Sequence, residues 1–150
     1  MKVFKKIDGT KVDVVKHTLS ILKENPNMQV HIGTDSQNKG PLTVYAVVIA
    51  YRFSHNGVHY ITYKESVPRI NDMWSRLWKE AELTLEVAEW FTSSININVE
   101  IDLDFNKDKS HDSHPLISAA KGWAESLGYK VNCKPDVDLI ATKAADVQCR

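Results

Sequence analysis

The sequence is poor in glycine and cysteine, two residue types that mark large functional classes. Its 150 residues include six glycines and two cysteines. So few glycines leave no paired glycine-rich loops to surround the phosphates of a nucleotide. Two cysteines do not make a disulfide framework, and Cys133 and Cys149 show neither Cys-x-x-Cys nor Cys/His metal-ligand spacing. No arrangement of a base and an orienting group accompanies them, which argues against thiol catalysis. We expect both thiols to be reduced, as in a cytoplasmic protein.

The sequence also lacks an excess of one charge and any long apolar run. Its 19 Lys and Arg balance 19 Asp and Glu, which excludes a globally basic nucleic-acid binder. No run approaches the ~20 apolar residues of a membrane-spanning helix. Residues 1–6 lack the apolar segment of a signal peptide. These absences predict a cytoplasmic protein without membrane association.

Charge is nevertheless uneven along the chain. Residues 1–16 carry five Lys against two Asp, and residues 52–79 carry five Lys or Arg against two acids. Residues 80–104 carry seven acids and no Lys or Arg. An acidic segment between basic ones suits a metal site beside a phosphate-contacting rim. A solvated surface of uneven charge is an equal alternative.

Hydrophobic periodicity and turn signals predict the order of the elements. The expected strands are 28–34, 42–53, 58–67, 95–105 and 129–133, and the expected helices are 11–24, 72–93, 115–127 and 139–148. Short turns join the first three strands, so they should form an antiparallel meander. We predict one α/β domain, 1–150, with a mixed five-stranded sheet and helices on both faces. An N-terminal extension, 1–27, adds an extra helix to the core, 28–150.

The first core strand leads to a single carboxylate. Val30 to Ile32 is a β-branched run with one histidine, and Gly33 and Thr34 precede Asp35. This order places Asp35 at or just past the end of a strand, where it can enter a cleft. The alternative is a turn-forming Asp that bonds its own backbone.

The helix predicted at 72–93 carries four glutamates. Its apolar stripe centres about 90° from Glu82, so Glu82 and Glu89 should lie at the boundary between core and solvent. Glu86 lies further out, and Glu80 points away from the core. A metal ligand must be sheltered and still reach a cleft, which favours Glu82. A solvated helix residue is the alternative for each of them.

Two further acids follow in later elements. Asp102 and Asp104 share one face of their predicted strand, and Asp104 is nearer the carboxyl end, where open sheets bind ligands. Asp146 follows a run of small residues that would let a helix approach the sheet closely. A solvated strand face and a surface position near the terminus are the respective alternatives.

Carboxylates on two strands and two helices match one known chemistry. Two Mg²⁺ or Mn²⁺ ions about 4 Å apart activate a water and stabilise the leaving oxygen of a phosphodiester. Hard oxygen ligands suit both ions. The predicted catalytic and metal-binding residues are Asp35, Glu82, Asp104 and Asp146, with Asp102, Glu86 and Glu89 as second choices.

This order of elements and acids resembles the ribonuclease H-like superfamily, and more closely the bacterial YkuK-type family within it. The superfamily's acids fall on the first strand, the helix after the meander, the fourth strand and the last helix. The matching segments are 32–37, 80–86, 104–106, 109–110, 134–136 and 141–146. The resemblance implies a nuclease-type site but names no substrate.

Two departures from the superfamily pattern bear on the chemistry. The segment 35–37, Asp-Ser-Gln, lacks the second acid of Asp-x-Glu exonucleases, which argues against that branch. The sequence ends four residues after Asp146, so the last helix should be short. Without Asp146 in the site, one metal ion becomes more plausible than two.

Polar residues near the acids are candidates for contacting substrate. They are Ser36, Gln37, Asn106, Ser110, Lys134 and Lys143. Turn chemistry is the alternative for Ser36 and Gln37, and a structural role is the alternative for each lysine. His111 and His114 sit in a polar loop, where one of them would be able to move a proton or both would simply be solvated. His31 is interpreted as a buried structural histidine.

Three functions remain at this point. The first is a metal-dependent nuclease acting on RNA, an RNA–DNA hybrid or structured DNA. The second is a non-catalytic ribonuclease H-like module that binds nucleic acid or a protein partner, which the zero net charge favours. The third, an actin-type ATP-binding fold, is disfavoured by the scarcity of glycine.

Overall fold

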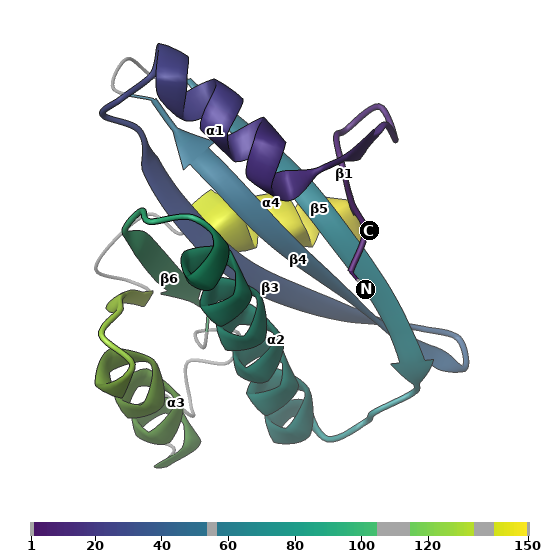
Figure 1. Ribbon diagram of the computed structural model, residues 1–150. Coiled ribbons are helices and arrows are strands. Elements are labelled where there is room, and N and C mark those ends of the chain that lie inside the picture. Colours follow the sequence, from purple (N-terminus) through teal and green to yellow (C-terminus); the bar gives the residue numbers. More distant parts are fainter. Residues whose placement is uncertain (1, 54–56, 105–114, 134–139, 150) are drawn as a thin grey trace.

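The computed structural model describes residues 2–53, 57–104, 115–133 and 140–149, without the side chains of 140, 142 and 143. Within these ranges, one mixed sheet of seven strands carries four helices on its two faces (Figure 1). The predicted α/β class and the helices on both faces are confirmed. None of the described helices is long and apolar enough to cross a membrane.

The strands pair in the order β2-β1-β5-β4-β3-β6-β7. Their bounds are β1 Phe4–Lys5, β2 Lys11–Val12, β3 Gln29–Lys39, β4 Leu42–Arg52, β5 Val58–Pro68, β6 Val99–Leu103 and β7 Lys130–Cys133. β3, β4 and β5 are antiparallel, as the predicted meander requires. β6 lies parallel to β3 on one side and to β7 on the other.

The predicted count of five strands is wrong, because a short hairpin of β1 and β2 extends the sheet beyond β5. Lys5 pairs with Thr62 of β5. Phe4 is fully buried, with its ring centroid 5.9 Å from that of Tyr63. Gly9, at φ +88°, takes the left-handed conformation in the turn of this hairpin. Residues 1–9 were expected as a short edge segment closed by Asp8 and Gly9, but strands of two residues have no detectable period and did not enter the predicted count.

Three helices cover one face of the sheet, and the fourth covers the other (Figure 1). The first three are α1 Val14–Glu24, α2 Met73–Ser94 and α3 Pro115–Ser126, and the fourth is α4 Ile140–Cys149. Asp13 and Asp72 cap α1 and α2 by accepting hydrogen bonds from the N–H groups of Lys16 and Ser75. α1 begins later than predicted, because β2 occupies the preceding residues.

Strand alternation divides the buried side chains into two layers. Ile32, Ile49 and Ile101 point from neighbouring strands toward α1, α2 and α3, in the larger core. The smaller core joins Ala46, Val48 and Ala50 of β4 to Ala141, Ala145 and Cys149 of α4. Small side chains on both sides let α4 lie close to the sheet. We call this side of the sheet the α4 face.

The sequence predicted that Asp35 lies at the end of its strand, but Asp35 lies inside β3. β3 continues to Lys39, and Asp35 pairs with Ala46 of β4. The polar residues after Asp35 stay extended because β4 supplies backbone partners along the whole strand. Asp35 is 5% exposed, and alternation directs it to the α4 face.

A pair of histidines joins α1 to β5. Nε2 of His17 lies 2.8 Å from Nε2 of His59, a contact that requires at least one neutral ring. Burial lowers the pKa of both histidines, and the charges of His59 and Lys6 lower the pKa of His17 further. Folding therefore favours neutral rings. The stability that depends on neutral rings is fully present above the unfolded histidine pKa near 6.5, and it is lost as the pH falls below that value.

The His17–His59 contact predicts that the protein loses stability in mild acid. We expect a lower urea midpoint at pH 5.5 than at pH 7.5, because protonation places two like charges side by side. His17→Gln should narrow the difference between the two midpoints. An equal pH difference in the wild type and the variant would show that the pair does not control it.

Candidate active site on the α4 face

Neighbouring strands bring two of the predicted acids to the same face. In the parallel pairing of β3 with β6, Gly33 lies beside Asp102. Asp35 and Asp104 each come two residues later, so alternation directs both of them to the α4 face. Asp104, which follows β6 directly, is partly buried. The face therefore carries carboxylates from two adjacent strands.

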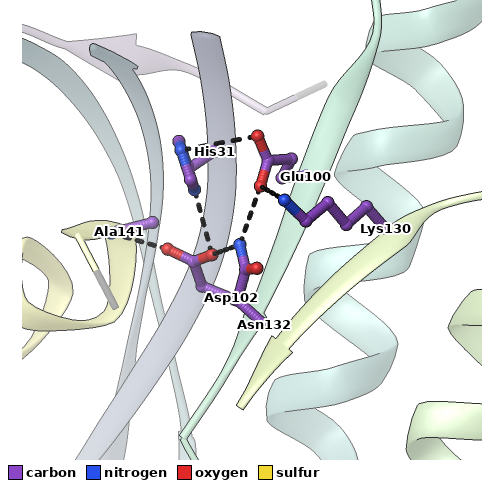
Figure 2. Close-up of polar contacts among 6 residues, drawn as sticks. All are labelled: His31, Glu100, Asp102, Lys130, Asn132 and Ala141. Carbon is purple, nitrogen blue, oxygen red and sulfur yellow. Dashed lines mark hydrogen bonds and ion pairs between the residues drawn. The ribbon is translucent and has the colours of Figure 1, made fainter. Parts of the chain in front are cut away.

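Asp102 is the centre of a buried polar network (Figure 2). Its Oδ1 accepts a hydrogen bond of 2.9 Å from Asn132 Nδ2 and lies 3.1 Å from His31 Nδ1. Its Oδ2 accepts a bond of 3.1 Å from the backbone N–H of Ala141, in the first turn of α4. A carboxylate there satisfies a free N–H group and interacts favourably with the helix dipole. Because both oxygens are engaged, we assign Asp102 a structural role.

Glu100 extends this network along β6 (Figure 2). Its Oε1 accepts a hydrogen bond of 3.1 Å from Asn132 Nδ2 and lies 3.5 Å from Lys130 Nζ, while Oε2 lies 3.9 Å from His31 Nε2. Burial alone would raise the pKa of Glu100. The Asn132 hydrogen bond and the charges of His31 and Lys130 together hold that pKa below its ordinary value. Glu100 is therefore ionised at neutral pH.

His31 is a buried structural histidine, as predicted. It is 3% exposed and lies between the carboxylates of Asp102 and Glu100. Because a carboxylate oxygen accepts, we take Nδ1 of His31 as the donor in its contact with Asp102. His31 thereby ties β3 to β6 and keeps the strand of Asp35 beside the strand that leads to Asp104.

The carboxyl end of α4 is docked on the strand of Asp35. The buried thiol of Cys149 donates to the backbone oxygen of Asp35, with an Sγ–O distance of 3.1 Å. Asp146 lies one helical turn earlier and is partly buried. Asp102 holds the other end of the helix at Ala141. With both ends of α4 held, Asp146 belongs to the helix segment that lies against β3.

On the opposite face, the acid of α2 that reaches the sheet is Glu80 and not Glu82. Glu80 is 4% exposed, and its Oε2 accepts a hydrogen bond of 2.5 Å from Oγ of Ser36, the residue after Asp35. Arg76 donates to Oγ of Ser36 at 3.3 Å and to its backbone oxygen at 3.2 Å. Glu82 is exposed. The expectation that Glu80 points away from the core is therefore wrong.

The polar composition of the buried helix face explains this error. Glu80, Thr84, Val87 and Phe91 recur at helical spacing, and all four are buried. The hydroxyl of Thr84 lies 2.7 Å from that of Thr34 on β3. A helical wheel built on apolar residues omits inward positions that are polar. The inferred inward face was consequently rotated away from Glu80.

The remaining candidates are exposed, partly buried or outside the described residues. Glu86 is exposed and pairs with Lys2 at 3.3 Å, and Glu89 is exposed and accepts a bond of 2.7 Å from the Tyr129 hydroxyl. Gln37 is partly buried on β3. Those outside the described residues are Asn106, Ser110, His111, His114, Lys134 and the side chain of Lys143.

Among the described residues, no group of three or more His, Cys, Asp or Glu side chains is arranged to hold a metal ion. The predicted four-carboxylate cluster is therefore not pre-assembled there. Its exposed member, Glu82, has the least support from the geometry. The chemistry of the donors still fits, because Asp35, Asp104 and Asp146 offer the oxygen ligands that Mg²⁺ and Mn²⁺ prefer. Metal binding stays a prediction.

The chain belongs to the ribonuclease H-like family, as its resemblance implied. The model of that family matches residues 13–150, which include all four helices and all strands except β1 and β2. The match does not distinguish the YkuK-type proteins from other members. No curated protein matches the sequence.

The network around Asp102 predicts a large loss of stability when its charge is removed. Asp102→Asn keeps the size of the side chain but leaves three donors with one acceptor oxygen, which should cost about 3 kcal/mol of unfolding free energy. Urea denaturation measures this loss. The matched control is Glu86→Gln, whose exposed ion pair with Lys2 should contribute less than about 1 kcal/mol. Similar losses in the two variants would contradict the structural role of Asp102.

Proposed function

We propose that the chain hydrolyses phosphodiester bonds of nucleic acid with a divalent ion held by Asp35, Asp104 and Asp146. The observation that carries the proposal is the docking of α4 on β3 through the Cys149 thiol and the Asp35 carbonyl. This contact ties the helix of Asp146 to the strand of Asp35. Membership of the ribonuclease H-like family adds the precedent of nucleic-acid chemistry on this fold.

Glu80 takes the place of Glu82 as the helix acid of the proposal. It is buried against the residue that follows Asp35, whereas Glu82 faces solvent. Together with Arg76 it fixes Ser36, and through Ser36 it fixes the backbone at Asp35. Glu80 is therefore a positioning residue for the ion-binding strand.

In the proposed reaction, the chain's own residues bind the ion and orient it. A divalent ion, when bound, supplies an activated water and stabilises the leaving oxygen. Asp35, Asp104 and Asp146 would be its ligands, and their burial keeps them partly shielded from bulk water. Because no three-ligand group is pre-assembled among the described residues, ion binding must also draw the carboxylates together. We therefore expect weak, millimolar-range metal affinity in the absence of substrate.

A non-catalytic module that binds nucleic acid or a protein is the second candidate. The same absence of a three-ligand group in the described ranges favours it. Titration with Mn²⁺ separates the two candidates. An ion-binding site raises the thermal midpoint as Mn²⁺ is added, and Asp35→Asn removes that rise. A non-catalytic module shows no Mn²⁺-dependent shift in either protein.

The proposal predicts that Asp35→Asn abolishes cleavage. Mn²⁺-dependent cleavage of end-labelled RNA, an RNA–DNA hybrid and a DNA hairpin should fall by at least about 100-fold, because a ligand charge is lost. Circular dichroism should show an intact fold, since the substitution keeps the size of the side chain. Full activity in a folded variant would contradict the assignment of Asp35.

The placement of the two helix acids predicts unequal effects of a matched pair of variants. Glu80→Gln should raise the Mn²⁺ concentration needed for half-maximal cleavage, because Ser36 and the neighbouring Asp35 lose their fixed position. Glu82→Gln removes the same charge two residues away and should leave this concentration unchanged. If Glu82→Gln raises this Mn²⁺ concentration and Glu80→Gln does not, the sequence-based choice of Glu82 as the helix ligand is restored.

A further inference from the structure

A basic groove lies at the opposite end of the α4 face from the Asp102 network. It is a cavity of about 410 Å³ beside the β1–β5 pairing. Its lining includes Lys5, Lys6, Lys64, Thr62, Ile7 and Gln148 and contains no Asp or Glu. We call this cavity the lysine groove. The groove therefore concentrates three positive charges in a chain with zero net charge.

The lysine groove shares its face of the sheet with Asp35. Ala46 of β4 pairs with Asp35 on one side and with Lys64 of β5 on the other. The three residues therefore stand at one level of the sheet, and alternation directs all three to the α4 face. Two strand spacings separate the backbones at Asp35 and Lys64, or about 10 Å.

Gln148 connects the groove to the carboxyl end of α4. It lines the groove and donates a hydrogen bond of 3.2 Å to the Tyr60 hydroxyl of β5. The next residue, Cys149, contacts the backbone of Asp35. The end of α4 thus lies between the lysines at one side and the proposed ion-binding strand at the other.

The lysines of the groove are available to bind an anion. Lys5, Lys6 and Lys64 are exposed, and none of them forms an ion pair within the described part of the chain. Asp8, in the same hairpin turn, does not line the cavity, and its carboxylate accepts a bond of 2.9 Å from Thr10 N–H. The walls of the groove therefore carry no acid, and the nearby acid that Lys6 acts on is Asp8, whose pKa the hydrogen bonds from Thr10 and the charge of Lys6 lower.

Apolar side chains at the rim complement the charges. Ile7 is 71% exposed and Val3 is 43% exposed, and both line the groove. Exposed apolar groups beside lysines suit a ligand that combines anionic groups with apolar surfaces, as the phosphates, sugars and bases of nucleic acid do.

We propose that the lysine groove binds the sugar–phosphate backbone of a nucleic-acid strand whose continuation passes the carboxyl end of α4 toward Asp35. This assignment rests on the proposed function for the direction of the strand. β1 and part of the lining come from the hairpin outside the matched family range. The hairpin therefore adds a substrate-binding surface to the family's fold.

Binding without cleavage tests the groove directly. The probe is a fluorescein-labelled 20-nucleotide single-stranded RNA, titrated in EDTA and followed by anisotropy over a range of salt concentrations. The triple variant Lys5→Gln, Lys6→Gln, Lys64→Gln should bind at least about tenfold more weakly at low salt, with a salt slope smaller by about 2. The control is Lys16→Gln, Lys23→Gln, Lys121→Gln, which removes the same charge from exposed positions elsewhere. It should keep the wild-type slope and most of the affinity.

The outcomes separate the groove from the catalytic proposal. Equal weakening in the two triple variants, or none in the groove variant, overturns the groove whatever the result for cleavage. Groove-dependent binding in a protein that cleaves no substrate supports the groove and rejects the proposed hydrolysis. Matching thermal midpoints of the two triple variants exclude unfolding as the cause of a difference.

Discussion

A fully buried carboxylate, Asp102, is the constraint on which the α4 face depends. Burying a charge costs several kcal/mol unless hydrogen bonds compensate for the lost water. Asp102 finds its partners on three other elements, at His31, Asn132 and the backbone of Ala141. Each partner is therefore needed to compensate for the burial of this charge. The hydrogen bonds of Asp102 thereby fix β3, β7 and α4 relative to β6.

α4 lies between an acidic end and a basic end of the face. Acids from β3 and β6 lie toward one end, beside the Asp102 network, and the lysines of β1 and β5 lie toward the other. α4 crosses between them on a layer of small side chains, with its carboxyl end against Asp35. A polyanion drawn to the lysines would be led to the carboxylates, which repel it unless a cation is present. This arrangement links binding in the groove to the proposed ion.

Much of the fold was predictable because its signals are local. The meander and the alternating helices and strands depend on hydrophobic spacing within each element and on short turns between them. The common face of Asp35 and Asp104 also follows from alternation. The inward position of Glu80 and the pairing of the β1–β2 hairpin in the sheet were not predicted, for a physical reason. A polar residue on a buried helix face and a strand of two residues acquire their meaning only from partners distant in the sequence.

The sequence by itself determined the elements, their order and the strands and helices that carry acids, because hydrophobic period and turn chemistry act over a few residues. Only the tertiary structure decided that Asp102 has a structural role. Asp102 and Asp104 are equivalent in the strand pattern, yet Asp102 is bound to the first turn of a helix that begins 38 residues later in the chain. Contacts across such separations arise from packing, which no local pattern encodes.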